Sequence, residues 1–116
     1  MKILIILNDP PYGTERSYNG LRLAHNLLKA DEEVDLTVFL MADAVACAKA
    51  GQVTPDGFYN IASMLKPVLR KGRLLLCGTC MDARGLVDSE MLEGCSRSNM
   101  KELTAATLAA DKVIVF

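Results

Sequence analysis

The sequence predicts an α/β sandwich built on a mostly parallel sheet of five strands. Apolar runs alternate along the chain with segments of helical periodicity, which is the pattern of strand–helix–strand units. Residues 2–7 are predicted to form the first strand. They contain a continuous Ile/Leu run over 3–7, which is typical of a parallel strand covered on both faces. With 116 residues, the chain has the length of one domain, which we expect to span residues 1–116. The order of the strands stays open.

The first half of the chain is predicted to hold two strands and two helices. A loop over residues 8–13 follows the first strand, because its two consecutive prolines lack backbone donors. Thr14 is predicted to cap a helix that runs to about residue 30 and carries an apolar stripe. A second apolar strand covers 34–40. Asp43 is then expected to cap a short helix that runs through Lys49.

A third helix and a third strand follow a polar excursion. Residues 58–70 have helical periodicity, and Pro67 is expected to kink or shorten that helix. Gly72 marks its end. Residues 74–77 are apolar throughout and form the third strand, which leads into a turn or short helix over 78–85.

The last segment is predicted to add a strand, a helix and a final strand. Residues 94–97 are expected to form the short fourth strand. Ser98 or Asn99 caps a helix that ends near Ala110, because both side chains accept hydrogen bonds from backbone N–H groups. Residues 112–116 form the fifth strand.

Composition and charge exclude several classes of protein. Thirteen Lys and Arg against 14 Asp and Glu give a net charge of −1, which argues against a nucleic-acid partner. The 51% of hydrophobic residues excludes a disordered chain. The first apolar run is too short for a transmembrane span or a signal peptide, so we expect no membrane partner and a cytoplasmic location.

Polar and reactive side chains follow the first three strands. Because ligands of open parallel sheets bind at the carboxyl ends of the strands, we expect these side chains on one rim. The residues proposed for a pocket there are Asn8, Tyr12, Gly13, Asp43, Gly78, Thr79 and Arg84.

Cys77 is the leading candidate for a reactive residue. It ends a strand before a predicted helix start, where backbone N–H groups favour an anion and lower the pKa of a thiol. Arg84 would add positive potential, and Gly78 would leave room for a ligand. The alternative is that Cys77 is a small core residue, since free cysteines are often buried.

Cys80 and Cys77 together form a C-x-x-C motif. Such a motif is also found in redox centres. Zinc would need about four ligands. Only Cys47, Cys95 and His25 remain to complete such a set, so we expect no bound metal. His25 is interpreted as a structural histidine and Cys47 as a packing residue, whereas Cys95 fits either strand core or surface. Dinucleotide and nucleoside triphosphate motifs are absent, so no cofactor is expected.

Several segments, in order and at compatible spacing, resemble the DsrE/DsrF-like family, and most closely its short YchN-type members. The segments are Pro11-Tyr12-Gly13, Leu40-Met41-Ala42-Asp43-Ala44-Val45, Tyr59-Asn60-Ile61, Cys77-Gly78-Thr79-Cys80-Met81-Asp82-Ala83-Arg84-Gly85 and Ala110-Asp111-Lys112-Val113-Ile114-Val115-Phe116. The resemblance implies a three-layer α/β/α fold and a homo-oligomer, either a trimer or a hexamer of two trimers.

The resemblance also implies a role for the two thiols of the C-x-x-C motif. The family's sulfur-relay members carry sulfur as a persulfide on a cysteine that ends the third strand, which Cys77 matches. They take it from a donor protein and pass it to an acceptor protein. Cys80 departs from the general relay pattern but matches the YchN-type motif, so it is either a resolving thiol or a sign that short members do not run the relay.

Three functional hypotheses follow. The first is a sulfur carrier, or sulfurtransferase-like protein, with Cys77 and Cys80 at its active site. The second is a non-enzymatic homo-oligomer that binds a ligand or a partner. The third is a thiol–disulfide switch that uses the C-x-x-C motif.

Overall fold

The computed structural model describes residues 1–116 and contains one five-stranded sheet whose strands are all parallel, in the order β4-β3-β2-β1-β5. The strands are β1 Lys2–Leu7, β2 Asp35–Leu40, β3 Arg73–Cys77, β4 Ser96–Ser98 and β5 Lys112–Val115. The helical segments are α1 Arg16–Ala30, η1 Ala42–Ala48, α2 Ile61–Lys71, α3 Gly78–Asp82, η2 Asp88–Glu90 and α4 Met100–Ala109. The predicted parallel five-stranded sheet is confirmed.

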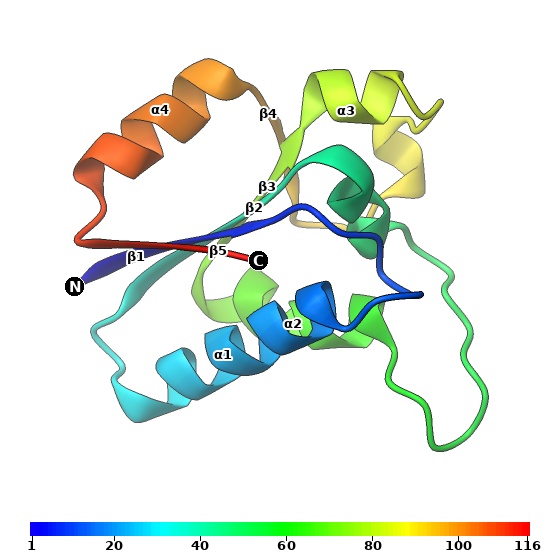
Figure 1. The fold of residues 1–116 in the computed structure, drawn as a ribbon, viewed down its shortest axis with the longest axis horizontal. Helices are drawn as coiled ribbons and strands as arrows, with labels where there is room; N and C mark the ends of the chain where they lie inside the picture. The colour runs from blue at the N-terminus through cyan, green and yellow to red at the C-terminus, as the bar shows by residue number, and fades with distance from the viewer.

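The helices cover the two faces of the sheet and complete a three-layer sandwich. Figure 1 shows α1 and α2 packed side by side on one face, with α4 and α3 on the other. On the α1 face, Gly20 lies so close to Leu7 and Phe116 that a side chain there would collide with Leu7. The absence of a side chain on Gly20 thus lets α1 approach the sheet closely.

The centre of the sheet supplies most of the core. Side chains of β1, β2 and β3 are buried on both faces, as the continuous apolar runs predict. Burying each such aliphatic side chain contributes about 1.5–3 kcal/mol. The largest fully buried side chains of the three strands are Leu4, Ile5, Leu7, Leu36, Val38, Phe39, Leu40 and Leu76.

Two predicted helix caps are wrong. Thr14 does not cap α1, because its hydroxyl donates to the Asp9 carboxylate at 3.0 Å; α1 begins at Arg16 without a side-chain cap. Asp43 does not cap η1 either. It lies in the first turn of η1, where its carboxylate accepts a hydrogen bond from Arg84 instead.

The helix α2 begins three residues later than predicted. Asn60 caps it by accepting a hydrogen bond from the Ser63 N–H at 3.1 Å, while Phe58 lies before the helix and is 70% exposed. Pro67 does not end the helix, which continues to Lys71. As predicted, the helix ends at Gly72, whose N–H donates to the Val68 carbonyl at 2.7 Å.

The C-terminal elements match the prediction within two residues. The fourth strand lies at residues 96–98 rather than 94–97. Of the two candidate caps for α4, Asn99 is the one used, since its side chain accepts from the Glu102 N–H at 2.9 Å. None of the helices combines the length and apolar character that a membrane crossing requires.

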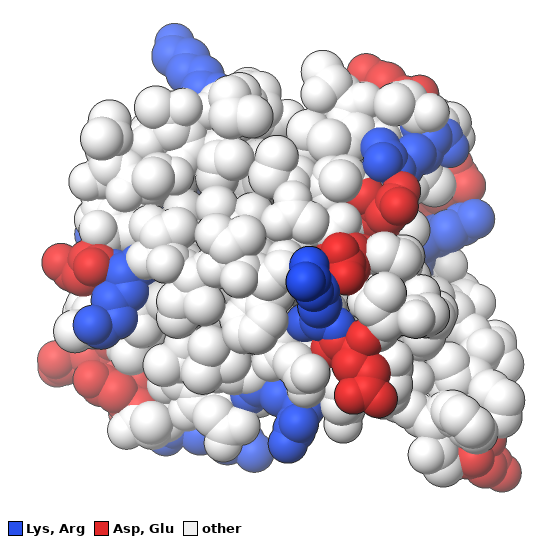
Figure 2. Space-filling model, viewed as in Figure 1, with Lys and Arg blue, Asp and Glu red and all other residues white.

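Charges on the visible face are mixed in sign. Figure 2 shows acidic and basic side chains next to one another to the right of centre, while much of the remaining face is uncharged. This face therefore presents no extended basic patch of the kind that binds nucleic acid.

Candidate functional site

The predicted rim exists because all five strands run in the same direction. Cys77 is the last residue of β3 and the residue before α3, with extended backbone angles. Its residue is only 7% exposed and belongs to the hydrophobic core, whereas Cys80 is half-buried. Cys77 is therefore less accessible than a surface thiol, and its burial agrees with the alternative that it is a small core residue.

Hydrogen bonds around the Cys77 sulfur favour its ionised form. Burial raises the pKa of Cys77. The Cys80 thiol, the Thr79 hydroxyl and the nearby backbone N–H groups of Thr79 and Cys80 outweigh this effect, and the pKa is lowered. The Thr79 hydroxyl oxygen lies 3.4 Å from the Cys77 sulfur. The N–H groups of Thr79 and Cys80 do not form regular cap bonds to it, yet their dipoles still favour negative charge.

The neighbouring thiol of Cys80 has the opposite tendency. Burial raises its pKa, and so does its hydrogen bond to Cys77. A backbone N–H from Ala42 reaches the Cys80 sulfur at 3.2 Å and partly offsets this. Ala42 is the chain's one non-glycine residue with a positive φ, at 52°, a conformation that disfavours a side chain. The pKa values of the two thiols are thus shifted in opposite directions, down for Cys77 and up for Cys80.

Arg84 connects the C-x-x-C segment to the loop after β2. Its Nε donates to Asp43 Oδ1 at 2.8 Å, and its Nη1 donates to the Cys80 carbonyl at 3.1 Å. The charge of Arg84 lowers the pKa of Cys80, and Arg84 is not among the leading causes of the lowered pKa of Cys77, so its main electrostatic effect falls on the second thiol rather than on the predicted one.

The space beside Gly78 is filled rather than open. A Cβ atom built on Gly78 would lie 2.8 Å from the Arg97 Nε, so the guanidinium lies against the backbone there. Arg97 is held by Asp82 at 2.7 Å and by Asp88 at 3.7 Å. The room for a ligand that Gly78 was expected to provide is thus occupied by Arg97, a residue that the sequence analysis did not consider.

Three of the expected pocket residues make contacts that do not involve Cys77 or Cys80. Asn8 donates to the carbonyl of Phe116 at 3.2 Å. Tyr12 donates to the Gln52 side chain at 2.6 Å, and its ring stacks on Tyr59 with centroids 5.9 Å apart. Tyr12 and Gly13 line a groove of about 510 Å³, and none of the four surface pockets is lined by Cys77 or Cys80. The single pocket proposed from the sequence is therefore not formed.

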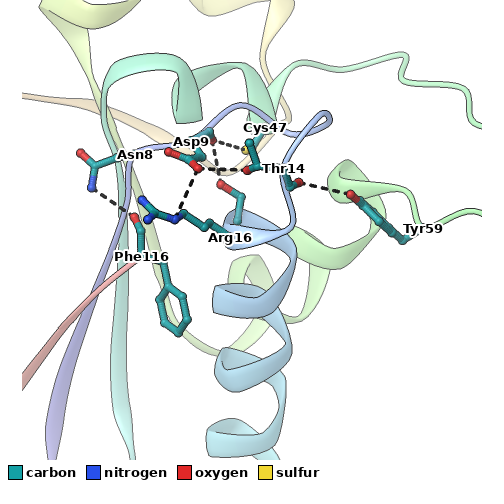
Figure 3. A network of polar contacts seen from close by, with 8 residues as sticks. Asn8, Asp9, Thr14, Arg16, Cys47, Tyr59 and Phe116 are labelled. Carbon is teal, nitrogen blue, oxygen red and sulfur yellow. Dashed lines mark hydrogen bonds and ion pairs between the residues drawn. The ribbon is translucent and has the colours of Figure 1, made fainter.

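A second polar cluster, shown in Figure 3, joins the loop after β1 to the start of α1. Asp9 accepts from Thr14 and lies 3.9 Å from Arg16, and its carbonyl accepts from the Ser17 hydroxyl at 2.7 Å. The Cys47 sulfur lies 3.8 Å from the same carbonyl. Burial raises the pKa of Cys47 to about 12, so this thiol stays protonated and serves packing, as predicted.

The other candidates from the sequence are structural. His25 is half-buried on α1, and its Nε2 lies 2.6 Å from the Met64 carbonyl of α2, in agreement with a structural role. Cys95 is half-buried before β4 and donates to the Leu92 carbonyl at 2.8 Å, and burial raises its pKa. No group of three or more His, Cys, Asp or Glu side chains lies close enough to hold a metal ion.

Ser98 is the second residue that sequence reasoning missed. It is the last residue of β4 and pairs in register with Cys77 of β3. Its hydroxyl is buried and has no hydrogen-bond partner. No local pattern pointed to it, because its relation to Cys77 depends on the order and register of the strands.

Comparison with known proteins assigns the family. The model of the DsrE/DsrF-like family matches residues 1–116. The chain belongs to this family. It is 40% identical to protein YchN of Escherichia coli over 99% of this chain and 98% of the relative, and 34% identical over the full length of both to an uncharacterized protein of Methanocaldococcus jannaschii.

The fold and a more distant relative agree with this assignment. The crystal structure of YchN from Escherichia coli matches with a TM-score of 0.93 over 99% of this chain and 98% of that one. A protein of Haemophilus influenzae named as a sulfurtransferase TusD homolog is 25% identical over 98% of each chain. The chain's relatives thus include one protein named for sulfur transfer.

Proposed function

We propose that the chain is a small sulfur carrier that holds a sulfur atom as a persulfide on Cys77 and passes it to a partner thiol. The observation that carries this proposal is the asymmetry of the four free thiols. Cys77 alone has a lowered pKa, while burial raises those of Cys47, Cys80 and Cys95. Because the thiolate is the nucleophile, Cys77 is the residue suited to take up sulfur.

The loading step keeps the oxidation state of the transferred sulfur. The Cys77 thiolate attacks the outer sulfur of a donor persulfide, R–S–SH. A bond forms between the Cys77 sulfur and that outer sulfur, and the donor's S–S bond breaks with its electron pair leaving as R–S⁻. Release to an acceptor thiolate repeats the same exchange in the other direction, so neither step needs an oxidant or a reductant.

Cys80 supports the thiolate of Cys77 through its hydrogen bond. It is poorly suited to attack a persulfide formed on Cys77. A Cys80 thiolate would displace HS⁻ from a Cys77 persulfide and leave a disulfide. The raised pKa of Cys80 keeps this thiolate scarce, which favours a persulfide that persists until an acceptor arrives. Burial of Cys77 further limits access by bulk thiols.

The proposal is tested by incubating the protein with a low-molecular-weight persulfide and locating the added sulfur by peptide mass spectrometry. We expect a gain of one sulfur atom on Cys77 that is absent from Cys77→Ser. The matched control is Cys95→Ser, which removes a half-buried thiol elsewhere and should load normally. Loading that spares Cys77 under every donor concentration would contradict the proposal.

A thiol–disulfide switch is the second candidate, favoured by the hydrogen bond between the Cys77 and Cys80 thiols. In that case the two residues form a disulfide whose reduction potential lies near or above that of the cytosolic glutathione pool. Titration against glutathione buffers, read out by differential alkylation, separates this function from sulfur carriage.

We further propose that the chain acts in the cytoplasm as a homo-oligomer, either a trimer or a hexamer. Free thiols fit a reducing compartment. Exposed apolar side chains on α4 and the edge strand β5 suit subunit contacts, among them Leu108, Val113 and Val115. Light scattering of the purified protein measures the subunit number. These exposed apolar side chains would also suit a homo-oligomer that binds a ligand or a partner and has no catalytic thiol. That alternative predicts that the protein forms oligomers but that Cys77 takes up no sulfur.

A further inference from the structure

Ser98 holds the molecule's one buried side-chain nitrogen or oxygen without a hydrogen-bond partner. The residue is 6% exposed, so bulk water does not reach its hydroxyl. Burying a hydroxyl without a partner destabilises a folded chain, because the group gives up its hydrogen bonds to water. Such groups are rare in native proteins, and one next to a reactive residue calls for a specific explanation.

The position of Ser98 relates it directly to Cys77. The two residues are partners in the parallel β3–β4 ladder. Neighbouring strands lie about 4.8 Å apart, and paired residues present their side chains on the same face of the sheet. Leu75, two residues before Cys77, lines a groove with α4, so by alternation Cys77 and Ser98 also belong to the α4 face.

The Cys77 thiol does not itself satisfy the Ser98 hydroxyl. The sulfur of Cys77 is engaged by Thr79 and by Cys80, and Ser98 remains unpaired. A persulfide extends Cys77 by one further sulfur, at the length of one S–S bond, roughly 2.0 Å. On a side chain in register with Ser98, that outer sulfur is the atom that would come within reach of the idle donor.

We propose that the Ser98 hydroxyl donates a hydrogen bond to the outer sulfur of a persulfide on Cys77. This inference rests on the proposed function. After the exchange described above, the outer sulfur carries the donor's proton or, once that proton is lost to solvent, a negative charge. Ser98 stabilises the ionised form, because hydrogen bonds to charged groups are stronger than those between neutral groups. The Ser98 hydroxyl thus makes no hydrogen bond in the protein without a persulfide and makes one only when Cys77 carries the additional sulfur.

The test compares the wild-type protein with Ser98→Ala, and uses Ser96→Ala as the matched control. Ser96 lies on the same strand and face but is exposed and pairs with Leu75 rather than with a cysteine. Each protein is equilibrated with cysteine persulfide, the loaded fraction of Cys77 is measured by peptide mass spectrometry, and the decay of the persulfide is followed after the donor is removed. The thermal midpoint and the alkylation rate of Cys77 are measured on the empty proteins.

We expect the empty Ser98→Ala protein to be at least as stable as the wild type, with the same alkylation rate at Cys77. Its persulfide should decay about tenfold faster, or its loaded fraction fall correspondingly, which is the scale of one hydrogen bond to a charged group. Ser96→Ala should match the wild type in every measurement.

The outcomes separate the two claims. A wild-type protein that loads on Cys77 while Ser98→Ala loads and decays equally overturns the role of Ser98 and leaves the proposed function standing. A lower thermal midpoint of empty Ser98→Ala also overturns it, since the hydroxyl would then have a partner in the free protein. A wild-type protein that never loads overturns the proposed function, and the role of Ser98 falls with it.

Discussion

The Nε of Arg84 donates to Asp43 Oδ1 at 2.8 Å, which ties the segment after α3 to the first turn of η1. The same guanidinium donates to the carbonyl of Cys80, so the C-x-x-C segment and the loop after β2 form one unit. As a largely exposed ion pair, it contributes at most about 1 kcal/mol to stability. Its consequence for function is electrostatic, because the charge of Arg84 lowers the pKa of Cys80.

Replacing Arg84 by Gln should raise the pKa of Cys80 further. The substitution removes the positive charge but keeps hydrogen-bond donors. It should change the pKa of Cys77 less than that of Cys80, because Arg84 is not among the leading causes of the Cys77 shift. Alkylation rates of each cysteine as a function of pH, resolved by peptide mass spectrometry, measure both values. Lys49→Gln, which removes a distant exposed ion pair with Glu90, is the control. If the alkylation rate of Cys80 depends on pH in the same way in Arg84→Gln and in the wild type, the charge of Arg84 does not lower the pKa of Cys80.

Replacing Cys80 by Ala should raise the pKa of Cys77. The Cys80 thiol is the leading hydrogen-bond donor to the Cys77 sulfur, and its loss removes stabilisation of the thiolate. The alkylation of Cys77 should then reach half its maximal rate at a higher pH than in the wild type. Cys95→Ala, which removes a thiol bonded only to a backbone carbonyl, should leave that midpoint in place. If alkylation of Cys77 reaches half its maximal rate at the same pH in Cys80→Ala and Cys95→Ala, Cys80 does not lower the pKa of Cys77.

Cys47 should make folding stability fall at alkaline pH. Its pKa is raised to about 12 in the folded chain, against about 8.5 for a free thiol, so the folded state retains a proton that the unfolded state loses. This contribution is fully present below the unfolded pKa and is lost as pH rises through the folded pKa. The wild type should lose about 1.4 kcal/mol per pH unit more than Cys47→Ala within that window. Urea unfolding at several pH values measures the free energy of unfolding of both proteins. If it falls with pH equally in the wild type and in Cys47→Ala, the prediction is contradicted.

Gly20→Ala should destabilise the fold by about 1–3 kcal/mol, because the new methyl group would collide with Leu7 across the α1–β1 contact. Denaturant unfolding gives the free energy of unfolding. The matched control is Ala30→Gly, which changes an exposed residue at the C-terminal end of the same helix. A Gly20→Ala protein as stable as the wild type would mean that α1 can move away from the sheet without loss.

The sheet was predictable because its central strands are apolar on both faces. The run at residues 3–7 contains no polar residue, which is typical of a strand in a parallel sheet covered by helices. Helix starts were less predictable. Thr14 is a good cap by residue type, yet a hydrogen bond to Asp9, five residues earlier in the same loop, engages its hydroxyl. Competition of this kind cannot be seen in a local pattern.

The candidate site was predictable only in part. Cys77 follows from a single strand and its end, which are local features. Arg97 and Ser98 matter because β4 lies beside β3 in a specific register, and neither strand order nor register is encoded in the periodicity of one segment. The separate contacts of Asn8, Tyr12 and Gly13 were also not predictable from single segments. Residues that follow parallel strands share one rim of the sheet, but this does not bring them into one pocket.

The most direct test of the central claim is a single transfer from the loaded protein. The protein is loaded on Cys77, freed from the donor, and mixed with one equivalent of a thiol-containing acceptor peptide. The account predicts that the sulfur atom leaves Cys77 and appears on the acceptor in equal amount, with Cys77 and Cys80 both recovered as free thiols. Release of the sulfur as sulfide, together with a Cys77–Cys80 disulfide and an unmodified acceptor, would contradict it.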